Sequence, residues 1–108
     1  MCLIMFHAEI SLYPIGTGST SASFYIAKAI EMIKDMQGIR YEINPMGTVL
    51  ESEDIDIIYT ASKKMMETVH NLGVYRVEVI LKIDSRRDKQ VKMEDKIESI
   101  KKMLNSRI

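Results

Sequence analysis

The feature that most constrains this chain is a hydrophobic pattern that runs through the same order twice. In each half, a stretch of period two, typical of a strand, comes first, and a stretch with helical spacing follows it. A second extended stretch then completes the half, so that each half reads strand, helix, strand. Right-handed crossovers would interleave the two halves into one four-stranded antiparallel sheet with two helices on one face. The sequence therefore predicts an α+β, ferredoxin-like βαββαβ sandwich, followed by an extra C-terminal helix. We expect strands at 3–12, 40–44, 46–51 and 74–84, and helices at 22–33, 54–72 and 92–105.

Turn and capping residues mark the ends of these elements. Pro14 and the glycines that follow it predict that the chain leaves the sheet there and turns. A Ser or Thr at 19–21 is expected to cap the first helix, and Gly38 to end it. Asp54 and Gly73 are expected to begin and end the second helix in the same way.

The first and last strands each have one apolar face and one mixed face. The apolar faces carry Ile4, Phe6, Ala8, Ile10 and Leu12 on the first strand, and Tyr75, Val77, Val79, Leu81 and Ile83 on the last. The mixed face carries Met5, His7, Glu9, Ser11, Arg76, Glu78, Ile80 and Lys82. This face is too polar for a monomer core, so we expect a partner subunit or a ligand to cover it. A narrow apolar stripe on the last helix also favours a dimer or tetramer, and it consists of Met93, Ile97, Ile100 and Leu104.

Length and charge favour one soluble domain. With 108 residues the chain has the size of an ordinary domain, so we expect residues 1–108 to form a single ferredoxin-like domain. Fifteen Lys and Arg balance fifteen Asp and Glu, which argues against a nucleic-acid or membrane binder. The one cysteine, Cys2, excludes an intramolecular disulfide framework and agrees with a reducing cytosol. The pattern predicts no signal peptide and no membrane span, and we therefore expect a cytoplasmic protein.

The chain lacks a recognisable catalytic or metal-binding motif. His7 and His70 lie on different predicted elements, and neither pairs with a nearby cysteine in a nucleophile motif. No cysteine pair suits a heavy-metal carrier, and no aromatic pair on the third strand suits the stacking of RNA bases. We therefore expect no enzyme activity, no cofactor and no metal.

Two further stretches have open interpretations. Residues 16–21 are rich in glycine and hydroxyl side chains, and they form either a turn with a helix cap or a loop that grips a small ligand. Residues 82–89 alternate basic and acidic side chains without an aromatic residue between them. This pattern favours a solvated strand end with ion pairs over an RNA contact.

Three segments together carry a resemblance to a known family. They are Ser11-Leu12-Tyr13-Pro14-Ile15-Gly16-Thr17-Gly18, then Asn44-Pro45-Met46-Gly47-Thr48-Val49-Leu50-Glu51, then residues 76–89 with Lys82-Ile83-Asp84-Ser85-Arg86-Arg87-Asp88. Their order resembles the small prokaryotic thiamine-binding proteins, which are related to YkoF-type binders of thiamine and hydroxymethylpyrimidine. The resemblance covers roughly residues 5–104 and departs from the family pattern at Ser52 and His70. It implies a ferredoxin-like fold whose subunits assemble through their sheets into dimers and tetramers.

Thiamine requires a particular kind of site. Its aminopyrimidine needs hydrogen-bond donors and acceptors beside a flat surface, and its thiazolium cation favours a carboxylate or an aromatic neighbour. If the ends of three strands converge beside the first helix, the polar contacts come from Glu9, Ser11, Ser21, Ser23, Asn44 and Thr48, and the apolar wall from Met46. Each residue also has a structural interpretation: Ser21 and Ser23 as caps, Asn44 as a turn residue, and Glu9 as half of an intersubunit ion pair with Arg76 or Lys82.

The leading hypothesis is non-catalytic binding of thiamine or its pyrimidine moiety by a cytosolic homo-oligomer. The alternative is a regulatory or structural oligomeric interaction module with a different small ligand. A small enzyme on the same scaffold ranks third, because no activated nucleophile or carboxylate pair can be assigned.

Overall fold

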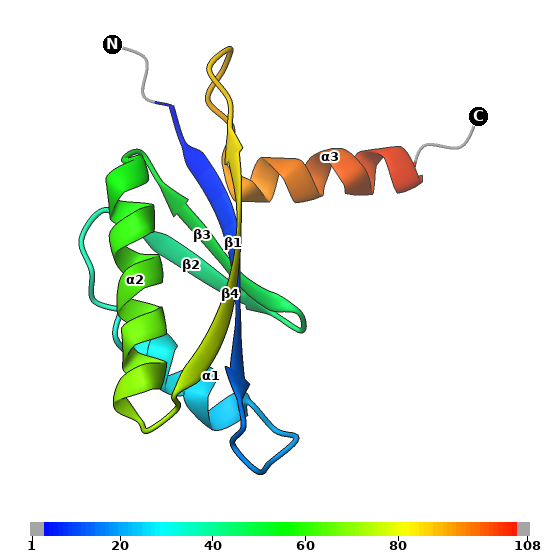
Figure 1. Ribbon diagram of the computed structural model, residues 1–108. Coiled ribbons are helices and arrows are strands. Elements are labelled where there is room, and N and C mark those ends of the chain that lie inside the picture. Colours follow the sequence, from blue (N-terminus) through cyan, green and yellow to red (C-terminus); the bar gives the residue numbers. More distant parts are fainter. Residues whose placement is uncertain (1–3, 106–108) are drawn as a thin grey trace.

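The computed structural model describes residues 4–105, which form a four-stranded antiparallel sheet and three helices. The elements in chain order are β1 (Phe6–Ile15), α1 (Ser23–Glu31), β2 (Arg40–Asn44), β3 (Gly47–Ser52), α2 (Ile55–Asn71), β4 (Arg76–Ser85) and α3 (Met93–Asn105). The strand order is β2-β3-β1-β4. Helices α1 and α2 lie on one side of the sheet, and α3 extends away on the other side (Figure 1). This architecture confirms the predicted α+β class and antiparallel sheet, and it is consistent with a ferredoxin-like fold.

The core lies between the sheet and the helices α1 and α2. Alternation on β1 buries Ala8, Ile10 and Leu12 on the helix side, as the period-two pattern predicted. Helix α2 buries Ile58, Ala61, Met65 and Val69, whose spacing of three and four residues places them on one side of the helix. Because β1 is flanked by β3 and β4, it is, with β3, one of the two interior strands of the sheet.

Strand β1 is longer than the sequence predicted. The predicted exit from the sheet at Pro14 is wrong, because Pro14 pairs with Val77 and the strand continues to Ile15 opposite Arg76. A proline is tolerated here because the pairing with β3 has already ended at Ile10, so this part of β1 has a neighbouring strand on one side only. The predicted start of β1 at Leu3 lies outside the described residues.

Helix α1 begins and ends at residues other than those predicted. Its N-cap is Ala22, and no side chain caps it, so the expected cap by a residue at 19–21 is wrong. The helix ends at Glu31, and the chain turns several times before it reaches Gly38. Gly38 still has a left-handed φ of 81° and lies against Ile57 of α2. The glycine therefore shapes the connection to β2, not the end of the helix.

The second half of the chain follows the pattern more closely. The Asp54 side chain accepts a 2.8 Å hydrogen bond from the Asp56 N–H and caps α2 as predicted. Gly73 has a φ of 97°, which suits the residue after a helix. Tyr75 does not join the core face, because it precedes β4 and is 98% exposed.

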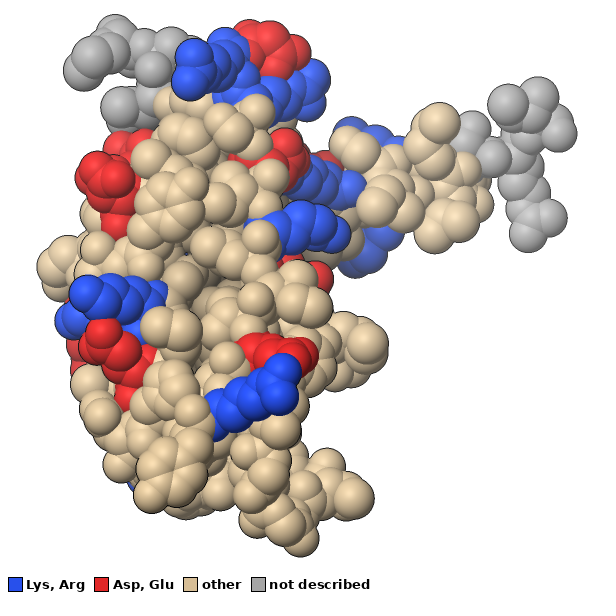
Figure 2. Space-filling model, in the orientation of Figure 1, with Lys and Arg blue, Asp and Glu red and all other residues tan. Residues whose placement is uncertain are grey.

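Helix α3 contacts the rest of the protein mainly through its first turn. Met93 is buried, whereas the rest of the helix extends from the body on the open side of the sheet (Figure 1). Charged side chains of both signs are interspersed over the face shown in Figure 2, and much of the outer part of α3 is uncharged there. The two faces of the sheet therefore differ: α1 and α2 cover one, and only the base of α3 lies over the other.

Candidate functional site

A hollow lies beside the start of β3, where β1 continues without a partner on that side. The pairing of β1 with β3 stops at Ile10 and Thr48, while the pairing of β1 with β4 runs on to Ile15. The start of α1 and the turn between β2 and β3 close this gap, which we call the sheet notch. It has a volume of about 240 Å³ and is lined by Ile10, Ser11, Leu12, Tyr13, Ala22, Ile26, Ile43, Asn44, Pro45, Met46, Gly47 and Thr48.

Hydrogen bonds fix the polar side of the notch. The Asn44 Oδ1 accepts from the Met46 N–H at 2.9 Å, and the Ser11 hydroxyl donates to the Met46 carbonyl oxygen at 3.1 Å. The Asn44 Nδ2 donates to Glu9 Oε2 at 3.2 Å. The β2–β3 turn is thus tied to β1 at two points, through Ser11 and Glu9, and the Asn44 amide has a set orientation.

Gly47 allows the close approach of the turn to β1. A Cβ atom at this position would lie 3.1 Å from the Ile10 carbonyl oxygen and 3.1 Å from the Ser11 hydroxyl oxygen. Both contacts are tighter than an ordinary van der Waals contact. A side chain at residue 47 would therefore push the turn away from β1 and change the shape of the notch.

The notch has an apolar wall and an acidic neighbour. None of its twelve lining residues is charged. The Glu9 carboxylate adjoins the lining, because it accepts a hydrogen bond from Asn44. Thr48 is buried within the wall, while Met46 and Ile43 are exposed at its mouth. A flat, uncharged or cationic group fits this combination better than an anion does.

Four of the seven residues predicted from the sequence line the notch: Ser11, Asn44, Met46 and Thr48. Glu9 adjoins it through Asn44. Ser21 and Ser23 flank the lining residue Ala22 but are exposed and do not line the notch themselves. The Ser21 hydroxyl accepts a long 3.4 Å hydrogen bond from the Ser23 N–H, and the other hydroxyls of this loop bond within the loop.

Within the described part of the chain, Glu9 forms no ion pair with Arg76 or Lys82. Lys82 stands directly opposite Glu9 in the pairing of β1 with β4, yet no salt bridge joins them. Arg76 lies six residues before Lys82, at the start of β4, and pairs with Glu78 at 3.5 Å. The contact that Glu9 makes within one chain is the one with Asn44, on the side of the notch.

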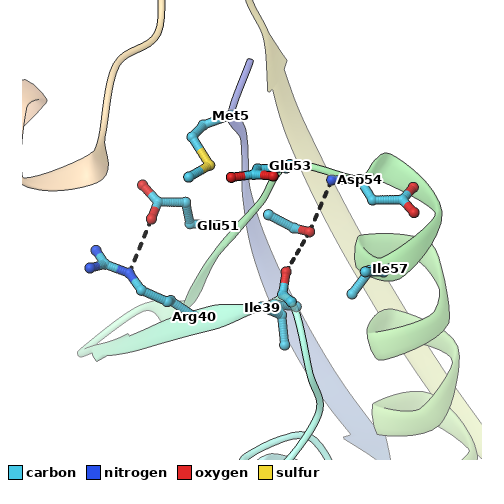
Figure 3. Close-up of a pocket in the computed structure, with 9 residues that line it drawn as sticks. Met5, Ile39, Arg40, Glu51, Glu53, Asp54 and Ile57 are labelled. Atoms are coloured by element: carbon cyan, nitrogen blue, oxygen red, sulfur yellow. Dashed lines mark hydrogen bonds and ion pairs between the residues drawn. The ribbon is translucent and has the colours of Figure 1, made fainter. Parts of the chain in front are cut away.

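A second hollow lies at the other end of β3 (Figure 3). It has a volume of about 430 Å³, and its walls include Met5, Arg40, Glu53 and Ile57. Its buried polar side chains are already paired: Arg40 Nε lies 3.0 Å from Glu51 Oε1, and the Ser52 hydroxyl donates to the Gly38 carbonyl oxygen at 2.7 Å. Because these groups satisfy one another, the hollow is better explained by the packing of β2, β3 and α2 than by a ligand.

A buried polar cluster near this hollow was missed by sequence reasoning. Glu51 is 3% exposed, and its Oε2 lies 2.9 Å from His7 Nε2 and 2.9 Å from the backbone nitrogen of Met93, whose N–H donates to it. Glu51 is therefore a cap for the start of α3 that comes from a strand far away in the chain. The signal in the sequence was a Glu and a His in positions that alternate with core residues, but nothing local linked them to residue 93.

Two ion pairs hold the base of α3 beside this cluster. The terminal Nη2 of Arg40 donates to Glu94 Oε2 at 2.7 Å. This hydrogen bond lowers the pKa of Glu94 and raises the pKa of Arg40. Lys96 donates to Asp84 at 2.6 Å and lowers the pKa of the Asp84 carboxyl. Of the stretch 82–89, Arg86 also pairs with Asp88. This ion pair lies within the stretch itself, as the pattern of a solvated strand end predicted.

Residues 4–105 contain no group of three His, Cys, Asp or Glu side chains placed to hold a metal ion. Among the helices of the same residues, none is long and apolar enough to cross a bilayer. The site with the clearest shape and polarity is the sheet notch.

The fold and the notch define an α+β protein with a small, largely apolar hollow in its sheet, beside the start of α1. Residues 8–101 match the family model described as thiamine-binding protein, and the chain belongs to this family. An uncharacterised UPF0045 protein of Methanothermobacter thermautotrophicus is 46% identical over 100 residues, which cover 93% of this chain and all of the relative. The Bacillus subtilis UPF0045 protein YqgV is 35% identical and covers 90% of this chain and 95% of its own length.

Solved structures agree with this assignment. A hypothetical protein from Methanocaldococcus jannaschii has a TM-score of 0.81 and 43% identity, and the match covers 90% of this chain and 96% of the other. A Thermotoga maritima protein, assigned provisionally to thiamine biosynthesis or salvage, has a TM-score of 0.72 over 89% of this chain and 98% of its own. Its identity is 20%, so this likeness concerns the fold.

Proposed function

We propose that this protein binds thiamine, or its pyrimidine moiety, without catalysis, and that it does so as a homo-oligomer in the cytosol. The observation that carries the proposal is the sheet notch, in which the oriented Asn44 amide lies between an apolar wall and the Glu9 carboxylate. The family to which the chain belongs is named for thiamine binding and not for a reaction.

The chemistry of the notch matches the two halves of thiamine. Its apolar wall supports a flat aminopyrimidine, whose ring edge needs both donors and acceptors. Ser11, Asn44 and Thr48 offer both kinds of group, and Met46 covers the ring from the mouth. The negative charge of the Glu9 carboxylate stabilises the positive charge of the thiazolium ring. A neutral ring would gain nothing comparable from this carboxylate. We place Ser21 and Ser23 at the rim, where they contact the ligand outside the notch proper.

Calorimetric titration of the protein with thiamine tests the proposal. Asn44→Ala should raise the Kd about tenfold or more, because a buried polar group that loses its partner costs about 1–3 kcal/mol. Asn71→Ala is the matched control, since Asn71 is exposed at the end of α2 and should leave the Kd unchanged. An unchanged Kd for Asn44→Ala would show that thiamine binds elsewhere.

Glu9→Gln distinguishes recognition of the thiazolium cation from recognition of the pyrimidine ring. If Glu9 faces the thiazolium, this variant should weaken thiamine binding while hydroxymethylpyrimidine, which is neutral, keeps its affinity. If Glu9 instead forms an ion pair between subunits, the variant should loosen the oligomer and weaken both ligands alike. Titration with both ligands and light scattering on this one variant distinguish the two roles.

The second candidate is a regulatory or structural interaction module with a different small ligand. The open face of the sheet and the extended α3 favour it, because both present surface suited to another subunit. A parent protein that gives no titration signal with thiamine or hydroxymethylpyrimidine, but is oligomeric by light scattering, would favour this module over the thiamine binder.

A further inference from the structure

The edge of β1 that borders the sheet notch has no partner strand. β1 and β3 are paired as far as Ile10 and Thr48, whereas β1 continues opposite β4 as far as Ile15. Residues 11–15 therefore have a neighbouring strand on the β4 side, and the notch adjoins their other side. Backbone N–H and C=O groups are strong hydrogen-bonding groups, so an open strand edge at a hollow is a place where another molecule can bind.

Two observations show which backbone groups of β1 face the notch. A Cβ atom at Gly47 would lie 3.1 Å from the Ile10 carbonyl oxygen, so this carbonyl points toward β3. Successive residues of an antiparallel strand direct their backbone groups to opposite edges, so the N–H and C=O of Leu12 point to the same side as those of Ile10. Pro14 agrees with this alternation, because it lacks an N–H and still lies opposite Val77 without ending the pairing with β4.

Leu12 thus presents one backbone donor and one backbone acceptor to the notch. It lines the notch, and within residues 4–105 no turn or loop backbone group forms a hydrogen bond with it. Continuation of the β1–β3 register would place Met46 opposite Leu12, but Met46 belongs to the β2–β3 turn and its carbonyl oxygen accepts from the Ser11 hydroxyl. The next residue that faces this side, Pro14, has no N–H to offer. The free edge therefore has a single donor.

The rest of the notch suits a flat ring that lies edge-on to β1. Ala22 and Ile26 line the notch from α1. Ile43 and Met46 line it from the β2–β3 hairpin. A ring in this position packs its faces against apolar side chains while its edge meets the strand. The volume of about 240 Å³ suits one small ring system better than an added peptide strand.

We propose that the Leu12 backbone binds the edge of the aminopyrimidine that carries the amine. The ring nitrogen beside the amine accepts from the Leu12 N–H, and the amine donates to the Leu12 carbonyl oxygen. One acceptor beside one donor is the complement of the pair that the strand edge leaves free. A site that depends on both bonds rejects a ring with the opposite pattern, because buried groups would then lack partners. The inference rests on the proposed function and names the groups that select aminopyrimidines among flat rings.

Oxythiamine tests the proposed contact. It has a carbonyl oxygen in place of the amine and an N–H in place of the neighbouring ring acceptor. Calorimetric titration should give a Kd at least about thirtyfold above that of thiamine, because donor then faces donor and acceptor faces acceptor. Turning the ring over would restore the two bonds, but it would also carry the thiazolium to the opposite side. Equal Kd values for thiamine and oxythiamine would overturn the proposal.

Asn44→Ala distinguishes the Leu12 backbone from the Asn44 amide. This amide also combines a donor with an acceptor, but its Oδ1 already accepts from the Met46 N–H and its Nδ2 donates to Glu9. If Leu12 binds the ring edge, the variant should weaken both ligands and keep the ratio of their Kd values at about thirty or more. A ratio that falls to about one would assign the ring edge to Asn44 and overturn the proposal.

Nuclear magnetic resonance observes the Leu12 amide in the unmodified protein. Saturation with thiamine should slow the hydrogen exchange of this amide at least about tenfold, because its N–H gains a partner. The amides of Ser11 and Tyr13 are matched controls, since they face β4 and should be protected with or without thiamine. Unchanged exchange of the Leu12 amide at saturation would overturn the proposal.

These outcomes separate this inference from the proposed function. Thiamine that binds as tightly as oxythiamine, with unchanged exchange at Leu12, would remove the backbone contact and leave a thiamine-binding protein. A parent that gives no titration signal with thiamine or hydroxymethylpyrimidine would overturn both the backbone contact and the proposed function.

Discussion

Removal of the Glu51 carboxylate should release α3 from the body of the protein. In Glu51→Ala, the Met93 N–H and the buried His7 ring lose a partner at 2.9 Å, and Arg40 loses one at 3.0 Å. An unpaired buried polar group costs about 1–3 kcal/mol, whereas the half-exposed Arg40 can turn to water. With two buried groups affected, we expect a loss of about 2–4 kcal/mol in the free energy of unfolding.

Thermal denaturation and hydrogen exchange measure this effect. For a domain of this size, the expected loss corresponds to a Tm lowered by about 10–25 °C, compared at equal protein concentration. Hydrogen exchange should accelerate along α3 and much less in α2. Glu51→Gln keeps one acceptor oxygen and should lose about half as much stability. Glu53→Ala, at an exposed position two residues away, is the control and should change little.

A Tm for Glu51→Ala within about 3 °C of the parent, with unchanged exchange in α3, would refute this reasoning. It would mean that the two ion pairs at Glu94 and Asp84 hold α3 without the cap, and that the buried cluster contributes little to its position.

Three further predictions concern the turns and the ion pairs. Gly47→Ala should weaken thiamine binding about tenfold or more in calorimetric titration, with a smaller loss in Tm, because the new Cβ pushes the β2–β3 turn away from β1. Gly38→Ala should destabilise the protein by about 1–3 kcal/mol in chemical denaturation, since its φ is 81° and a Cβ would lie 2.9 Å from the Ile57 side chain. The ion pairs lower the pKa of Glu94 and of Asp84, so their stabilisation is full at neutral pH and is lost as the pH falls through those lowered values. The protection factors of the α3 amides, which are exchange rates corrected for the intrinsic rate at each pH, should therefore fall only below about pH 4, and a fall already at pH 6 would contradict this account.

The fold was predictable because its hydrophobic periods are unbroken. The alternating residues of β1 and β4 and the helical stripe of α2 decide which face of each element is buried, and burial of these faces dominates the stability. The end of β1 was predicted wrongly at Pro14, because a proline is excluded from a central strand and the sequence does not show that β3 stops short. Tyr75 continued the alternation in the sequence but lies before β4, where no neighbour covers it.

The candidate site was predictable only in part. Ser11, Asn44, Met46 and Thr48 converge because strand pairing brings their segments together, and they lie in the first two of the three segments that carry the family resemblance. Ligand contacts of all seven residues, with Ser21, Ser23 and Glu9 outside the notch lining, remain predictions, since they depend on where a ligand lies. The role of Glu51 as a cap for α3 could not be predicted, because it joins residues 42 positions apart through side-chain geometry.

The central position of β1 has a consequence for synthesis. Among the described elements β1 leaves the ribosome first, yet β4, which covers one of its edges, begins only after the sixty residues from 16 to 75. At about 5–20 residues per second, that edge waits for roughly 3–12 s. The β2–β3 hairpin emerges earlier and can cover the other edge, but one edge of β1 stays open until β4 emerges. A strand that lies in the interior of the finished sheet thus exposes one edge to chaperones during synthesis.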